Sequence, residues 1–144
     1  GIAIVAIVSD FISGAVEWLS PNNDDDHWDI IEGQGSIFHP SFAGVSLGLL
    51  HGSQPDAFVV CHEPTRRNMR GVETPLPTIN DVIDQTIKLG SLTNKNIKCI
   101  GIALNTSTMT EGIDLLKQKI EDEFKLPCLD PLIDDLAPFV NQIK

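Results

Sequence analysis

The residues most suited to catalysis or ligand binding follow short apolar runs of the chain. Glu32 ends one such run and opens the segment Glu32-Gly33-Gln34-Gly35-Ser36. The two glycines let the backbone approach a ligand closely, and their N–H groups can form an anion-binding nest. A carboxylate beside a bound phosphate is a common magnesium ligand. We therefore predict a cofactor site at Gly33, Gln34, Gly35 and Ser36 with a catalytic or metal-binding Glu32; the alternative is a tight turn that carries a surface carboxylate.

Asp10 stands at the end of another apolar run and directly precedes a stretch with helical spacing. A carboxylate at that place is a good helix N-cap, because its oxygen accepts from the free N–H groups of the first turn. It can equally serve as a second metal-binding carboxylate facing the Glu32 region. Both interpretations of Asp10 stay open on the residues alone.

Three histidines are candidates for proton transfer, because imidazole titrates near neutral pH. His39 and His51 flank a glycine-containing apolar stretch, and His62 follows a third apolar run, immediately before Glu63. We predict that His39 and His62 are catalytic and that His51 contacts substrate, although the pattern does not choose firmly among them. The spacings do not match those of a structural zinc site, and no Cys-x-x-Cys is present, so we expect no structural zinc.

Two further positions carry recognition chemistry. Arg66, Arg67 and Arg70 form a basic cluster in an acidic chain, and guanidinium groups bind carboxylates or phosphates through paired hydrogen bonds. We predict that this cluster binds an anionic substrate; the alternative is a solvated loop. Asn105 ends a fourth apolar run, where its amide can pair with the edge of a purine or cap the following Thr-Ser-Thr turn.

Strands that alternate with helices must position these residues. The apolar patterns predict strands at 2–8, 27–32, 57–61 and 97–104, an extended piece at 126–128, and helices at 11–19, 78–89, 110–124 and 132–143. Thr78 is the expected N-cap of its helix and Gly90 ends it, while Pro138 is expected to kink the last one. The alternation predicts an α/β domain with a mainly parallel sheet flanked by helices, in which ligands bind at the carboxyl ends of the strands.

The glycines at 44, 48 and 52 are close together in an apolar stretch. Such spacing indicates either tight packing or a loop wrapped against a ligand.

Composition narrows the possible partners. The chain has 144 residues and a net charge of −10, which repels nucleic-acid phosphates and anionic membranes. Its apolar runs are too short to cross a bilayer. The three cysteines are widely spaced, which is typical of a protein of the reducing cytoplasm. We expect a cytoplasmic protein that binds a small molecule and forms a homo-oligomer.

The chain resembles a known family in several segments, which are residues 9–17, 32–36, 39–40, 44–56 and 61–64. It is similar to domain-of-unknown-function family 1611, some of whose members are described as D-glutamate N-acetyltransferases. The resemblance covers nearly the whole chain, and the long match at 44–56 is its most specific part.

The resemblance implies the back portion of a P-loop NTPase-like domain of the dethiobiotin synthetase type. In that comparison Glu32 falls at a Walker B-like acidic position, Asn105 at a nucleobase contact, and residues 126–131 where the base pocket is completed. No G-x-x-x-x-G-K-[ST] motif occurs in the chain. We therefore expect the Walker A segment and an N-terminal Rossmann-like domain to lie upstream or on a separate chain.

The resemblance also implies an activity, namely transfer of an acetyl group from acetyl-CoA to the amino group of D-glutamate. One alternative is an ATP- and magnesium-dependent ligase or kinase-like enzyme, with Asp10 and Glu32 around the metal. The other is a non-catalytic nucleotide-binding module.

Overall fold

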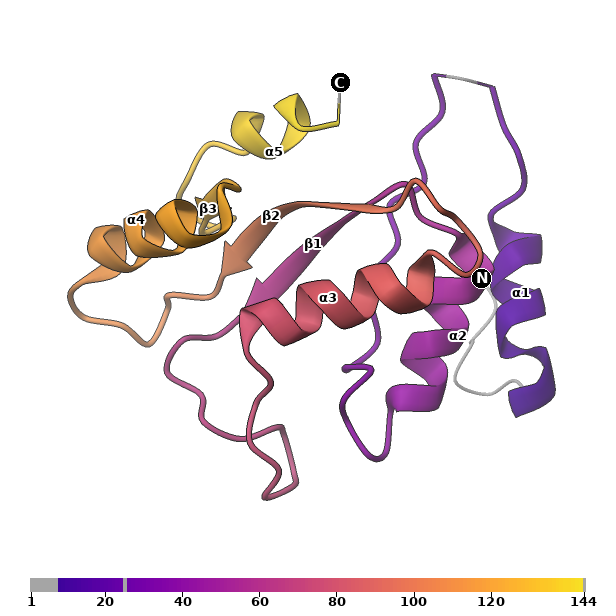
Figure 1. The fold of residues 1–144 in the computed structure, drawn as a ribbon, viewed down its shortest axis with the longest axis horizontal. Helices are drawn as coiled ribbons and strands as arrows, with labels where there is room; N and C mark the ends of the chain where they lie inside the picture. Colours follow the sequence, from indigo (N-terminus) through magenta and orange to yellow (C-terminus); the bar gives the residue numbers. More distant parts are fainter. Residues whose placement is uncertain (1–7, 25, 144) are drawn as a thin grey trace. The chain divides into compact units, whose positions relative to one another are not determined.

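The computed structural model describes residues 8–24 and 26–143. They fall into two compact units, one within residues 8–56 and 85–97, the other within residues 57–84 and 98–143. Figure 1 labels the helices and strands. The strand predicted at 2–8 lies outside the described residues except for Val8, which has no regular secondary structure.

The first unit is built on two helices that pack closely. The short 3₁₀ turn η2 (Ser9–Phe11) leads into α1 (Ile12–Leu19), and α2 (Ala43–Ser53) lies against α1. A Cβ atom at Gly48 would lie 2.4 Å from Cγ2 of Ile12, and one at Gly52 would lie 2.3 Å from the carbonyl oxygen of Ser13. Gly48 and Gly52 therefore serve tight helix packing, whereas a Cβ atom at Gly44 would meet nothing within 4 Å.

One sequence prediction in this unit is wrong, and one of the two open interpretations of Asp10 is excluded. Residues 27–32 form no strand, because a strand needs a hydrogen-bonded neighbour and the sheet of the described residues contains only three other segments. Their apolar side chains are exposed, with Ile30 at 95% and Trp28 at 64%. Asp10 is not a helix N-cap either, because it lies within η2, where the N–H of Phe11 already donates to the carbonyl of Val8 at 2.8 Å.

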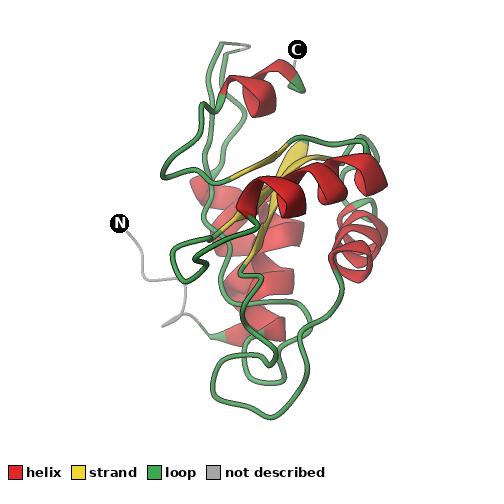
Figure 2. Cartoon of the chain, turned by 90° about the vertical axis from the view of Figure 1, so that its left-hand side faces the viewer, coloured by secondary structure: helices red, strands yellow, loops and turns green. Residues whose placement is uncertain are grey.

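The second unit contains a parallel sheet. Its strands β1 (Ala57–His62), β2 (Lys98–Leu104) and β3 (Cys128–Leu129) lie in the order β1-β2-β3. Figure 2 shows the strands in yellow. His62 pairs with Leu104 in the register of β1 and β2, and Ala103 pairs with Leu129 in that of β2 and β3. This alignment brings the residues after all three strands to one edge. The predicted α/β class with a parallel sheet flanked by helices is confirmed.

The sheet of the second unit carries an apolar core. Its buried members are Val60, Ile102, Leu104, Ile120 and Cys128, against which side chains of the flanking helices pack. These helices are α3 (Ile79–Gly90) and α4 (Ile113–Phe124).

The predicted start of α3 is also confirmed. The hydroxyl of Thr78 accepts from the N–H of Asp81 at 3.1 Å, and the Asp81 carboxylate accepts from the N–H of Thr78 at 3.2 Å. The two residues form a reciprocal capping box, and α3 ends at Gly90 as expected.

The last helix, α5 (Ala137–Asn141), is shorter than the 132–143 predicted. Its first turn contains Pro138, where a missing N–H is tolerated, so the proline does not kink the helix. Upstream, the N–H of Asp134 donates to the carbonyl of Asp130 at 2.9 Å and forms a separate turn. None of the helices in the described part of the chain has the length and apolar character needed to cross a bilayer.

Candidate functional site

A cleft of about 450 Å³ opens at the carboxyl ends of the three strands. Its polar lining comes from the residues that follow each strand, with apolar walls from Ala103, Leu104, Pro131 and Leu132. The polar members are His62, Glu63, Arg66, Asn105 and Asp130. This is the sheet edge at which parallel α/β domains bind ligands, so we take the cleft as the candidate site.

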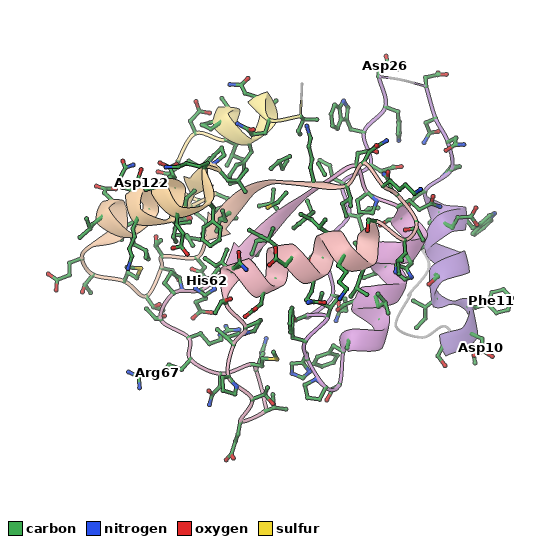
Figure 3. All side chains as sticks on the ribbon, in the orientation of Figure 1. Asp10, Phe11, Asp26, His62, Arg67 and Asp122 are labelled. Atoms are coloured by element: carbon green, nitrogen blue, oxygen red, sulfur yellow. The ribbon has the colours of Figure 1, made fainter. Side chains whose placement is uncertain are left out.

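His62 is the last residue of β1 and is half-buried in the cleft wall (Figure 3). Its carbonyl accepts from the N–H of Asn105 at 2.9 Å, which extends the pairing of the two chain segments beyond the ends of their strands. Burial lowers the pKa of the imidazole below its ordinary value, and the nearby Glu63 carboxylate opposes this shift in part. His62 is therefore mostly neutral at pH 7 and able to accept a proton.

Arg66 lies in the same cleft and pairs with Glu63 through its Nη2. The pair sits in a tight turn, in which the N–H of Arg66 also donates to the carbonyl of Glu63 at 3.1 Å. A guanidinium has five N–H donors in a fixed fork, so one contact to Glu63 leaves others for an anionic ligand.

The predicted three-arginine cluster does not act as one group in the structure. Arg67 and Arg70 are exposed and do not line the cleft, and Arg67 extends away from the ribbon (Figure 3). The substrate-binding roles of these two residues stay predictions, and the geometry favours Arg66 for contact with a ligand in the cleft.

Asn105 presents a hydrogen-bond donor. Its Oδ1 accepts from the N–H of Ser107 at 3.1 Å and from the Ser107 hydroxyl at 2.7 Å. A backbone N–H can only donate, so the atom facing it must be the amide oxygen, and the NH₂ group points elsewhere. Because both acceptor positions of Oδ1 are used, Asn105 offers a donor to a ligand acceptor. It cannot also accept from the amino group of an adenine in this geometry.

Asp130 is the residue of the site that the residue pattern alone did not single out. It is only 3% exposed, and its Oδ2 accepts from the N–H of Thr106 at 3.1 Å and from the Thr106 hydroxyl. Its Oδ1 accepts from the N–H of Leu132 at 3.0 Å. The Asp130 N–H donates to Asp134 at 2.7 Å, and Asp134 is in turn paired with Lys117. The available signal was a carboxylate directly after the last extended apolar piece.

Hydrogen bonds hold both carboxylates of this network in the charged form. The Thr106 hydroxyl is the main cause that lowers the pKa of Asp130, and the Lys117 ammonium is the main cause for Asp134. A carboxyl whose folded pKa is depressed stabilises the fold above its unfolded pKa of about 3.9 and loses that contribution as pH falls through the folded pKa.

We therefore expect the second unit to lose stability below about pH 4, where these carboxyls protonate in the unfolded chain while hydrogen bonds still keep them charged in the folded one. Asp130→Asn should lower the free energy of unfolding at pH 7 by about 1–3 kcal/mol, because its amide NH₂ faces the N–H of Thr106. The variant should also show a shallower decline on acidification. Urea unfolding between pH 3 and 7 measures both effects, and equal slopes for the two proteins would contradict the role of Asp130.

The thiols of the second unit are poor nucleophiles at neutral pH. Cys61 lines the cleft and is exposed, yet the protein atoms around its thiol partly exclude water and so raise the pKa of the thiol. Burial is also the main cause that raises the pKa of Cys128 to about 11. Both stay protonated at pH 7, so neither is favoured as a covalent catalyst.

The segment from Glu32 to Ser36 lies in the first unit as an exposed loop before α2. Gly35 has φ +60°, a conformation that glycine adopts readily, and the Ser36 hydroxyl accepts from the N–H of Phe38 at 3.1 Å. The carbonyl of Gln34 accepts from the Ser46 hydroxyl, which ties the loop to α2. The cofactor roles of Gly33, Gln34, Gly35 and Ser36 stay predictions.

Asp10 and Glu32, the predicted metal ligands, are both exposed in this unit. Among the residues that the structure describes, no group of three or more histidine, cysteine or carboxylate side chains is arranged to hold a metal ion. The metal site therefore stays a prediction.

The other two candidate histidines of the sequence have structural partners in the first unit. His39 is buried, its Nδ1 accepts from the N–H of Ser41 at 3.1 Å, and its ring lies 4.6 Å from that of Phe42. His51 on α2 donates from Nε2 to the carbonyl of Leu89 at 3.0 Å. Among the three histidines, the geometry favours His62 for chemistry.

The chain matches the model of one protein family over residues 1–140, described as the P-loop domain of a domain of unknown function, DUF1611_C. A solved member of the DUF1611 family from Anabaena variabilis superposes with a TM-score of 0.87 at 30% identity, over 99% of this chain and 43% of that one.

Two curated relatives are named D-glutamate N-acetyltransferase. One, from a Pseudoalteromonas species, is 49% identical over 145 residues, which cover 99% of this chain and 44% of the relative. The other, from Tritonibacter scottomollicae, is 44% identical over 95% of this chain and 44% of its own length. The chain thus spans less than half the length of these relatives. With the family model matched almost from end to end, the chain belongs to the DUF1611 family and corresponds to its P-loop domain.

Proposed function

We propose that this chain carries part of the active site of an N-acetyltransferase, which moves an acetyl group from acetyl-CoA to the amino group of an acidic amino acid such as D-glutamate. The observation that carries the proposal is the cleft at the carboxyl edge of β1–β3, which combines a neutral imidazole, a guanidinium and an amide donor. The names of the two curated relatives support the choice of substrate.

The cleft residues divide the work of acyl transfer. An amino acid arrives as an ammonium, which must lose a proton before its nitrogen can attack, and His62 is the base for that proton. Acetyl-CoA supplies the acetyl thioester. The new bond joins the substrate nitrogen to the acetyl carbon, the bond from that carbon to sulfur breaks, and CoA leaves as a thiol after taking up a proton.

Charge and hydrogen bonding in the cleft fit such substrates. Arg66 can bind a substrate carboxylate with the N–H donors that Glu63 does not occupy. The amide NH₂ of Asn105 can donate to a carbonyl or ring-nitrogen acceptor. The apolar walls formed by Leu104, Pro131 and Leu132 suit a planar ring such as the purine of CoA.

The second candidate is an ATP- and magnesium-dependent ligase or kinase-like reaction. The match to a P-loop domain model favours it, because such domains bind nucleotide phosphates. In this alternative Asp10 and Glu32 would bind the metal, and the Gly33–Ser36 backbone would approach the phosphates.

We further propose that another portion of the protein completes the site. The exposed apolar side chains of Trp28, Ile30 and Ile31 in the first unit are of the kind that a neighbouring element covers. A phosphate-binding loop in that portion would supply the cradle that this chain's motifs lack.

Assays of the full-length protein separate the candidates. Acetyl-CoA and D-glutamate should yield N-acetyl-D-glutamate without ATP or magnesium. An absolute requirement for magnesium and ATP, with release of ADP, would favour the second candidate instead. If purified, folded protein yields no N-acetyl-D-glutamate under any of these conditions, the acetyltransferase proposal is wrong.

Replacement of Asn105 tests the orientation of its amide. Asn105→Asp keeps the oxygen that accepts from Ser107 but replaces the donor with a second, charged acceptor. We expect acetyl-CoA binding to weaken roughly 10- to 100-fold, the range for loss of a hydrogen-bond donor combined with repulsion of the ligand acceptor. Ser107→Ala removes one of the two orienting bonds and should weaken binding less. Calorimetric titration with acetyl-CoA measures both, and equal affinity of Asn105→Asp and wild type would contradict the assignment.

A further inference from the structure

We infer that Asp130 is a positioning residue, which fixes two of the loops that line the cleft and thereby holds Asn105 in place to donate to a ligand. This inference rests on the proposed function of the cleft. It concerns a buried carboxylate to which the proposed chemistry gives no direct part.

Asp130 accepts hydrogen bonds from two loops that are far apart in the sequence. Its Oδ2 accepts from the N–H and hydroxyl of Thr106, the residue after Asn105, 24 positions earlier in the chain. Its Oδ1 accepts from the N–H of Leu132, which also lines the cleft. One carboxylate therefore connects the loop after β2 to the loop after β3.

The position of Asp130 is itself fixed by hydrogen bonds to Asp134 and, through it, to Lys117. Its N–H donates to Asp134 at 2.7 Å, and Lys117 on α4 is paired with the same Asp134 carboxylate. Asp130 is 3% exposed, and Thr106 is 4% exposed, so water competes little for these bonds. Since α4 packs on the core of the second unit, the network ties the cleft loops to a rigid element.

The consequence for Asn105 follows from chain connectivity. Its own N–H donates to the carbonyl of His62, and the next residue, Thr106, is held by Asp130. With the backbone fixed on both sides and Oδ1 bound by Ser107, the amide NH₂ has one direction left. A loosened Thr106 would let Asn105 turn and would weaken the contact to a ligand without changing any group that touches it.

Hydrogen exchange tests the structural half of the inference without any ligand. In Asp130→Asn, the amides of Thr106 and Leu132 should exchange at least about tenfold faster than in the wild type. The amide of Ile102, which donates to the carbonyl of Pro127, should exchange faster only by the factor that the lower free energy of unfolding accounts for. An equal acceleration of all three amides would show general destabilisation alone and would overturn the inference.

Acetyl-CoA binding tests the functional half of the inference, namely that Asp130 holds Asn105 in place for the ligand. We expect Asn105→Ala and Asp130→Asn each to weaken acetyl-CoA binding by roughly tenfold, and the double variant to bind no more weakly than the weaker single one, because both changes remove the same contact. Multiplied losses in the double variant, or wild-type affinity of Asp130→Asn beside a weakened Asn105→Ala, would overturn the inference. Wild-type affinity of Asn105→Ala would instead overturn the proposed use of the cleft, while the exchange measurement would still decide the role of Asp130.

Three further variants guard against misfolding and charge effects. Thr106→Val removes only the hydroxyl bond to Asp130 and should weaken acetyl-CoA binding by about threefold, whereas Thr106→Ser keeps the hydroxyl and should restore wild-type affinity. Asp122→Asn removes a carboxylate from the exposed side of α4 (Figure 3) and should bind like the wild type. Weakened binding in Asp122→Asn, or equal effects of the two Thr106 changes, would contradict the proposed role.

Discussion

Replacing His62 with glutamine is expected to lower kcat for acetyl transfer by about 10²- to 10⁴-fold, the range for loss of a general base. Glutamine keeps a polar side chain of similar length but cannot take a proton from the substrate ammonium at neutral pH. The KM for acetyl-CoA should change little, because the base acts on the amino acid. Steady-state kinetics of the full-length protein measure both constants.

The pH dependence gives an independent check of the same residue. A general base works when it is unprotonated, so activity rises as pH increases through its pKa. Burial lowers the pKa of His62, so the acidic limb of kcat/KM should lie below about pH 6.5, the ordinary value for histidine. His62→Gln should lose this limb. His27→Gln, a change at an exposed histidine, should retain both the rate and the limb; a comparable loss there, or full activity of His62→Gln, would contradict the assignment.

Replacing Gly52 with alanine is expected to have the largest effect on stability. The new Cβ would lie 2.3 Å from the backbone carbonyl oxygen of Ser13, so α1 and α2 would have to move apart. Overpacking of this kind costs about 1–3 kcal/mol of unfolding free energy and more when backbone must shift. Chemical unfolding followed by circular dichroism measures the loss.

The same helix provides graded controls. At Gly48 the alanine Cβ would meet the Ile12 side chain, which can adjust by rotation, so the loss should be smaller. At Gly44 nothing lies within 4 Å, and alanine should stabilise the helix by about 0.5–1 kcal/mol because glycine is the more flexible residue when unfolded. Equal stability of the Gly52 and Gly44 variants would show that α1 and α2 do not pack as described.

Local signals in the sequence predicted the elements that depend on neighbouring residues. Thr78 and Asp81 are three positions apart and cap α3 as the pattern indicated. The β-branched runs of β1 and β2 were also recognisable, and the expected ends of these strands placed His62 and Asn105 at one sheet edge. These features can be recognised from neighbouring residues, without knowing which distant segment packs against them.

Other features depend on which distant segment packs against a residue. Residues 27–32 have the composition of a strand, but strand formation requires a partner for its backbone groups. The glycine spacing of α2 fits either tight packing or a ligand-binding loop, and only the contacts of Gly48 with Ile12 and of Gly52 with Ser13 decide for packing. Asp130 accepts a hydrogen bond from Thr106 only because β2 and β3 are adjacent in the sheet. A local sequence pattern could therefore not predict this hydrogen bond.

Ligand should bind in the cleft at the carboxyl edge of β1–β3. Cys61 offers a direct probe, because it lines this cleft and is exposed, whereas Cys99 is half-buried and Cys128 is buried. The measurement is the rate of Cys61 alkylation in the full-length protein at pH 8, followed by peptide mass spectrometry. Saturating acetyl-CoA should slow alkylation of Cys61, and Asn105→Asp should remove this protection at the same concentration. An unchanged rate of Cys61 alkylation while acetyl-CoA is demonstrably bound would show that the ligand binds elsewhere and would contradict binding in the cleft.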